Sequence, residues 1–210
     1  MTVVDLIQLV RNVTNQFKSS NCLSSFAKDS MLQFLSAISL KSLSINESQI
    51  KHIMEKPPAP IGYLSIADER DFSVGIFIMS PESSIPLHDH PNMYGFIKVL
   101  FGSALISPYQ VKSFPNINNK VRCQIIPSTV INESSEVSCL TPTSENIHEI
   151  KALSVFAFLD VLFPPYCDGQ RPCSYYKVDN TSIKGNECFL NIRSPPSLDE
   201  YHTFSLNFCN

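Results

Sequence analysis

The sequence predicts a mostly β protein, an antiparallel sandwich or barrel of the jelly-roll kind, with helices packed on the outside at its N-terminal end. After Pro60 the chain is divided into many short runs of β-branched and aromatic residues, separated by Pro, Asn and Ser. Before Pro57 the apolar residues recur with helical spacing instead. A chain of 210 residues can build one substantial core, so we expect a single domain, residues 1–210, with helices in 1–58 and the barrel and C-terminal segment in 60–210.

Three helices are predicted in the N-terminal part. Apolar residues follow three- and four-residue spacing in 3–17, and a second helical segment is indicated in 26–38. Ser44 and Glu47 have the Ser-x-x-Glu spacing of a capping box, so a short third helix is expected to begin there. It must end before Pro57, because proline interrupts a helix. We expect these helices to pack against the sheet.

Strands are predicted where short apolar runs lie between turn-forming residues. These runs are residues 63–66, 72–78, 96–101, 103–107, 121–126, 137–140, 148–153, 155–162 and 175–178. From Ser194 the chain is expected to cross the surface, before Phe204, Leu206 and Phe208 alternate in a last strand.

The composition argues against several classes of function. A net charge of -3 without a Lys/Arg run argues against nucleic acid as a partner, and no apolar run is long enough to cross a membrane. The first residues lack the layout of a signal peptide. Seven cysteines without a Cys-x-x-Cys pair are expected to be free thiols in a reducing compartment. We therefore expect a monomer in the cytosol, with the nucleus as the alternative location.

Two of the five histidines stand in one short motif, Pro86-Leu-His-Asp-His-Pro91. In an extended chain His88 and His90 point to one face and Asp89 to the other, so both imidazoles can meet one metal ion. The alternative is a pair of surface or packed histidines. His148 begins another predicted strand, and in a small barrel the two strands can face each other across the interior. His52 and His202 are expected to be surface or packed residues.

A His-x-His motif with one distant His resembles the metal site of the cupins. The first cupin motif has a Glu four or five residues after the second His and a Gly seven residues further on. Gly102 is in place, but Tyr94 and Gly95 stand at the Glu position. A site of three histidines without a carboxylate resembles the thiol dioxygenases instead.

Five motifs narrow the resemblance to the family of cysteamine dioxygenases and plant cysteine oxidases, over residues 60–178. They are Pro86-Leu-His-Asp-His-Pro91, Lys98-Val-Leu-Phe-Gly102, Leu140-Thr-Pro-Thr-Ser144, Phe158-Leu-Asp-Val-Leu-Phe-Pro-Pro-Tyr166 and Cys173-Ser-Tyr-Tyr176. Two positions depart from the family pattern, where glycine is usual. Asn92 tolerates a left-handed turn well, whereas Glu145, just before His148, tolerates positive φ poorly.

The resemblance implies a cupin fold, a double-stranded β-helix, that holds Fe(II) on His88, His90 and His148. It implies a dioxygenase that adds both atoms of O2 to the sulfur of an aminothiol, giving a sulfinic acid. That substrate is cysteamine or the N-terminal cysteine of a protein. Two alternatives stay open: a non-catalytic cupin that binds a metal or ligand, and another cupin enzyme, such as a zinc or manganese isomerase, which would usually keep the Glu.

The resemblance also points to Asp160 and Tyr166 beside the metal. An inward Asp160 needs a partner, such as a substrate ammonium, a water or a histidine N–H, whereas at a strand edge it would face solvent. Tyr166 either hydrogen-bonds the substrate or oxygen, or is a core tyrosine. Cys173 and Tyr175 share a face if their segment is extended, so they could form a thioether beside an oxidising iron or simply be neighbours.

Overall fold

The structure is a computed structural model that describes residues 2–20, 22–55, 59–113 and 120–197 and the backbone of 203–205. Its helical elements are α1 Val3–Ser20, α2 Ser25–Ser36, the 3₁₀ helix η1 Lys41–Leu43 and α3 Glu47–Glu55. Its strands are β1 Ile61–Asp68, β2 Ser73–Met79, β3 Ser84–Asp89, β4 Tyr94–Phe101, β5 Ser103–Ser113, β6 Lys120–Ile125, β7 Thr129–Asn132, β8 Ser138–Leu140, β9 Ile147–Ala152, β10 Phe156–Phe163, β11 Tyr175–Lys184, β12 Glu187–Arg193 and β13 Thr203–Ser205.

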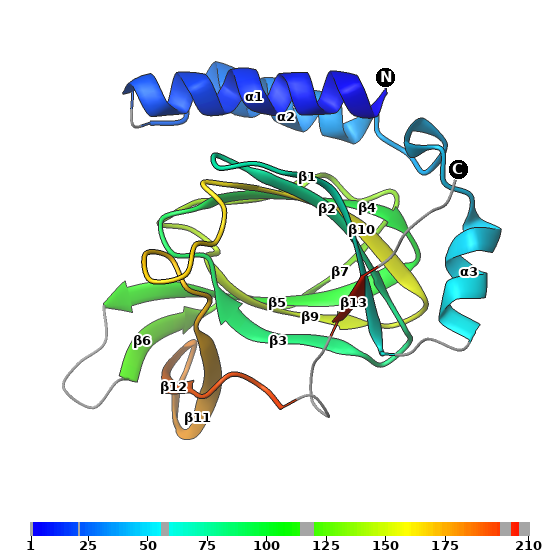
Figure 1. Cartoon of the computed structure of the whole chain (residues 1–210). Helices are drawn as coiled ribbons and strands as arrows, with labels where there is room; N and C mark the ends of the chain where they lie inside the picture. Colours follow the sequence, from blue (N-terminus) through cyan, green and yellow to red (C-terminus); the bar gives the residue numbers. More distant parts are fainter. Residues whose placement is uncertain (1, 21, 56–58, 114–119, 198–202, 206–210) are drawn as a thin grey trace.

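The strands form two sheets that face each other and together make a barrel (Figure 1). The six-stranded sheet has the order β13-β1-β2-β10-β4-β8, and the seven-stranded sheet has the order β6-β12-β11-β3-β9-β5-β7. Neighbouring strands in both sheets are antiparallel, except β1 with β13. The chain passes from one sheet to the other between β3, β4 and β5, which is the jelly-roll pattern. The predicted fold class is confirmed.

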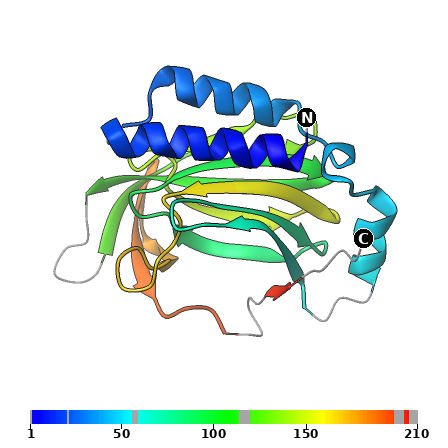
Figure 2. The ribbon, with the colours of Figure 1, turned by 45° about the horizontal axis from the view of Figure 1, so that its top comes forward.

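Helices α1 and α2 lie side by side over the outer face of the six-stranded sheet (Figure 2). Their buried side chains, which include Leu6, Val10 and Met31, pack in one cluster with Ile76 and Leu159 of the sheet. Burial of each such side chain stabilises the fold by about 1.5–3 kcal/mol. Ion pairs from α1 to the β1–β2 turn hold the same interface: Arg11 with Glu69 at 2.6 Å, and Lys18 with Asp71.

The capping box of α3 lies two residues later than predicted. The side chain of Asn46 accepts a hydrogen bond from the Gln49 N–H at 2.9 Å, and the Gln49 side chain accepts one from the Asn46 N–H at 2.9 Å. Ser44 instead ends the preceding 3₁₀ helix in a left-handed conformation, with φ of 58°. An N-cap residue needs extended backbone, so Ser44 does not cap α3.

Every predicted strand up to residue 178 overlaps a strand of the structure, but three strands were missed. These are β3, β7 and β12. Strand β7 has only four residues, three of them exposed, so it lacks an apolar pattern. Of the predicted last strand, β13 covers Phe204, while Leu206 and Phe208 lie outside the described residues. His202, which was predicted to be a surface or packed residue, lies outside them too.

The interior between the sheets is filled by a second apolar cluster, which includes Met79, Ile85, Ile97 and Phe156. A third, smaller cluster lies where β6, β11 and β12 extend the seven-stranded sheet. The six cysteines among the described residues are free thiols, as predicted. None of the described helices is long and apolar enough to span a membrane.

Candidate metal centre

His88 and His148 lie on neighbouring strands and are directly opposite each other in the register of β3 and β9. The expectation that their strands face each other across the barrel is therefore wrong. The chain crosses to the other sheet and back between β3 and β9, which allows residues far apart in sequence to become paired neighbours. Paired residues of antiparallel strands have Cα atoms only about 4.5–5.5 Å apart, so the two rings meet without spanning the interior.

His90 follows directly after β3 and joins the other two rings. Its N–H donates to the carbonyl of Asn146 at 3.1 Å, and the Asn146 amide donates to the His90 carbonyl at 2.5 Å. The ligand atoms of the three histidines all lie within 4.8 Å of one another. The Nε2 atoms of His90 and His148 are 3.3 Å apart. All three side chains are buried, with 3–8% of each residue exposed.

Each ring is held on its outer side by an oxygen or by the main chain. His88 Nδ1 is 2.8 Å from the Pro86 carbonyl, and His90 Nδ1 is 2.9 Å from the Tyr166 hydroxyl. That hydroxyl donates to the Asp89 carbonyl at 2.6 Å, so it accepts the proton of His90 Nδ1. The His148 ring bonds to the main chain of Glu145. Such partners fix the ring orientation and leave the lone pair of Nε2 of His88 and His90 for a metal.

The electrostatics of the cluster favour neutral imidazoles. Burial lowers the pKa of His88 to about 4. Burial, with the neighbouring rings adding to it, also holds the pKa values of His90 and His148 well below the usual value. Three neutral rings at physiological pH are three nitrogen donors, which fit a divalent transition metal.

Two tight turns place the ligands. Asn92, after the His-x-His motif, has φ of 57°, and Glu145, before His148, has φ of 53°. Both positions thus have the left-handed backbone that the sequence departures suggested. The Asp89 carboxylate points away from the cluster and accepts hydrogen bonds from Ser174 N at 2.8 Å and the Tyr176 hydroxyl at 2.7 Å. Asp89 therefore ties β3 to β11.

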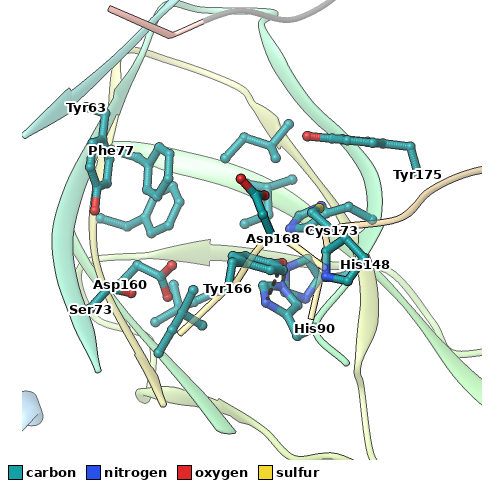
Figure 3. A pocket seen from close by; sticks show the side chains of 17 residues that line it. Tyr63, Ser73, Phe77, His90, His148, Asp160, Tyr166, Asp168, Cys173 and Tyr175 are labelled. Atoms are coloured by element: carbon teal, nitrogen blue, oxygen red, sulfur yellow. Dashed lines mark hydrogen bonds between the residues drawn. The ribbon is translucent and has the colours of Figure 1, made fainter. Parts of the chain in front are cut away.

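A cavity of about 410 Å³ opens beside the histidines. Its apolar lining includes Phe77, Ile97 and Phe158. In Figure 3, Tyr63 and Phe77 lie on the opposite side of the cavity from His148 and Cys173. The three histidines are thus buried from solvent but accessible to a small molecule in the cavity.

The comparison with known families agrees with this geometry. The model of the PCO_ADO family matches residues 31–200, well over half of the chain. The chain belongs to the PCO_ADO family. This membership confirms the resemblance found in the sequence motifs.

Two curated relatives illustrate the PCO_ADO membership. The chain is 35% identical over 142 residues to 2-aminoethanethiol dioxygenase of Homo sapiens, covering 57% of this chain and 53% of that protein. It is 38% identical over 121 residues to plant cysteine oxidase 1 of Arabidopsis thaliana, covering 56% of this chain and 41% of that protein. The chain thus spans about half the length of these relatives.

Among solved structures, one similar chain is an uncharacterized conserved protein with a double-stranded β-helix domain from Klebsiella pneumoniae. The sequence identity is 15% and the TM-score is 0.41, over 60% of this chain and 92% of that one.

Asp160 lies in β10 and lines the cavity of this PCO_ADO member, so its side chain faces inward. Burial raises the pKa of its carboxyl to about 7. The structure also brings Cys173 and Tyr175 to the same cavity. Burial raises the pKa of the Cys173 thiol.

Tyr63 and Asp168 also line the cavity, although the sequence analysis did not assign them to the site. The Tyr63 ring lies against Gly75, where an added Cβ would be 2.3 Å from the Tyr63 hydroxyl oxygen. Gly75 is the register partner of Asp160, so the missing side chain lets Tyr63 reach this part of the cavity. Burial and the Asp160 charge raise the pKa of Tyr63 to about 12. A glycine inside an apolar strand pattern was the signal that marks such a close approach.

Proposed function

We propose that this protein is a non-haem Fe(II)-dependent thiol dioxygenase. It adds both atoms of O2 to the sulfur of an aminothiol, cysteamine or the N-terminal cysteine of a protein, and forms the sulfinic acid. The reaction is balanced as RSH plus O2 giving RSO2H, without a further reductant. The names of the curated relatives support a thiol substrate of this kind.

The observation that carries this proposal is the cluster of three buried, neutral histidines without a carboxylate. The described residues contain no other His/Cys/Asp/Glu group of this kind. Three neutral donors leave the full positive charge of a divalent ion, which favours an anionic ligand such as a thiolate. Iron, when bound, supplies the redox chemistry with oxygen that zinc would lack.

The residues around the histidines bind and orient the substrate. We assign Asp160 to the substrate ammonium, because its inward carboxyl has no cation nearby to neutralise it among the residues that line the cavity. Tyr166 orients His90 through Nδ1 and thereby positions the metal ligand. The free thiols support a reducing compartment, and we propose that the protein is located in the cytosol. We also propose that it is a monomer.

Cys173 and Tyr175 are proposed to form a thioether crosslink. The S–H bond of Cys173 and one ring C–H bond of Tyr175 would be replaced by an S–C bond, and the two protons and two electrons lost would reduce one O2 to H2O2. After aerobic turnover with iron, the intact protein is expected to weigh two hydrogens less than its sequence value, unchanged by reductant. A Cys173 thiol that stays fully open to alkylation after turnover would contradict this.

The function is tested on protein purified without oxygen and loaded with Fe(II). Addition of cysteamine or of a Cys-initiated peptide is expected to start oxygen uptake, with a mass gain of two oxygen atoms on the thiol. His148→Ala is expected to abolish iron binding and turnover. His52→Ala is the matched control, because the His52 side chain is 85% exposed and lies outside the cluster.

Absence of uptake with both substrates, at full iron loading, would reject the proposed function. If the unmodified protein turns over and His148→Ala keeps full activity, the assignment of His148 as a metal ligand is rejected.

A further inference from the structure

The charged residues that line the cavity are of one sign. Apart from the histidines, they are Asp160 and Asp168, and no described Lys or Arg lines it. Asp160 is half-buried and lies in the barrel wall on β10, whereas Asp168 is exposed and lies in the loop between β10 and β11. The cavity therefore has one carboxylate in its wall and a second one on its solvent-exposed side.

The loop that carries Asp168 is held in place on both sides. Before it, the Tyr166 hydroxyl bonds to His90 and to the Asp89 carbonyl. After it, the Arg171 N–H bonds to the Cys167 carbonyl at 2.8 Å, and the Arg171 side chain donates to the Pro165 carbonyl at 3.1 Å. The loop thus presents Asp168 from a fixed position.

The side chain of Asp168 points in a different direction from those of its neighbours in this loop. Cys167, Gln170 and Arg171 line a separate surface hollow beside the β1–β2 turn, whereas the Asp168 side chain points into the main cavity (Figure 3). Its carboxylate takes part in none of the hydrogen bonds or ion pairs found among the described residues. Because the Asp168 carboxylate forms no hydrogen bond or ion pair within the loop and points into the cavity, it is available to a ligand.

The cavity is also larger than a free aminothiol requires. Cysteamine has four non-hydrogen atoms, which at a water-like ~30 Å³ each occupy on the order of 120 Å³. The cavity of about 410 Å³ leaves room for the next part of a longer substrate.

We propose that Asp168 is a specificity residue that binds a cationic side chain on the residue following the N-terminal cysteine of a peptide substrate. This inference rests on the proposed function. It predicts that the enzyme prefers peptides that begin with Cys-Lys or Cys-Arg to peptides that begin with Cys-Glu or Cys-Asp. Asp168 lines the same cavity as His90 and Tyr166, and the second Cα of a bound peptide lies only 3.8 Å beyond that of its cysteine.

The test uses three peptides that differ only in the second residue, Cys-Lys, Cys-Ala and Cys-Glu, with an otherwise neutral sequence. The iron-loaded enzyme is expected to have kcat/KM in the order Lys, Ala, Glu, with about three- to fivefold at each step, the range of one partly exposed ion pair. Anaerobic binding of the same peptides by calorimetry should give the same order. Raising the salt concentration should reduce the preference.

Asp168→Asn is expected to bring the three peptides to equal kcat/KM, and Asp168→Lys is expected to reverse their order. Asp29→Asn is the matched control. It removes one exposed carboxylate on α2, outside the cavity, and should keep the original order. Melting temperatures of all variants show that they are folded.

The outcomes separate the two proposals. Turnover of all three peptides without a preference in the unmodified enzyme, or a preference that persists in Asp168→Asn and Asp168→Lys, would overturn the role of Asp168 alone. Lack of turnover of Cys-Ala peptide and of cysteamine would overturn the proposed function, and this inference with it.

Discussion

Each imidazole of the histidine cluster also has a contact outside the cluster. The contacts come from Pro86, Tyr166 and the main chain of Glu145, and they belong to three different parts of the chain. Because the rings are oriented before a metal arrives, the protein gives up little further side-chain entropy on binding it. The cluster is preorganised by its surroundings rather than by the histidines alone.

Asp160 should give the activity a dependence on pH. Burial raises its pKa to about 7, so its carboxylate forms only as the pH rises through neutrality. We expect kcat/KM for cysteamine to increase between about pH 6 and pH 7.5, measured by oxygen uptake. Asp160→Asn should lose this increase and lower kcat/KM about tenfold or more, the cost of one charge-assisted hydrogen bond. An unchanged pH profile in Asp160→Asn would assign the increase to another group.

At the scale of elements, the turn before β9 holds a glutamate in left-handed backbone. Glu145 has φ of 53°, a conformation that costs an L-residue about 1–2 kcal/mol. Glu145→Gly is therefore expected to stabilise the fold by about 0.5–1 kcal/mol, after the larger chain entropy of glycine in the unfolded state is subtracted. Urea unfolding measures this. Asn92→Ala, at the other left-handed turn, should lower the stability of the fold instead. A loss of stability in Glu145→Gly would show that the contacts of the Glu145 side chain contribute more to stability than its backbone strain costs.

Strands β1 and β2 are coupled through Tyr63 and Gly75. A Cβ at position 75 would be 2.3 Å from the Tyr63 hydroxyl oxygen, so Gly75→Ala must displace the ring. We expect a loss of about 1–3 kcal/mol in urea unfolding, as for other overpacked sites. In a Tyr63→Ala background the same substitution should cost much less, because the obstructing ring is gone. Equal costs in both backgrounds would mean that the strain lies elsewhere.

At the scale of the whole molecule, the helices and the barrel share one apolar cluster. Residues of α1, α2 and α3 pack with the outer face of the six-stranded sheet, so removal of the helices would expose that face. We propose that they belong to one domain and unfold together. Helical circular dichroism and tyrosine fluorescence should give coincident melting curves. Two separate transitions would indicate that the helices are an independent unit.

Much of the fold and of the candidate site could be predicted because the signals are local. Helical spacing in 3–17, alternating short runs after Pro60 and the His88-x-His90 motif each depend on residues that are near in sequence. The strand β7 and the capping box at Asn46 were missed or misplaced, since their patterns are short and compete with similar ones nearby. Sequence reasoning also placed His88 and His148 across the barrel, whereas they are paired neighbours.

The sequence by itself determined the mostly β class, the three candidate ligands, the absence of a carboxylate at Tyr94 and Gly95, and the resemblance to a family. Only the tertiary structure decided that Tyr166 holds His90, that Tyr63 lies over Gly75, and that Asp168 points into the cavity. The physical reason is the separation along the chain of the residues that each signal involves. Periodicity and motif spacing record what each segment prefers, whereas side-chain direction in a loop, and the pairing of β3 with β9, follow from the packing of segments far apart in the chain.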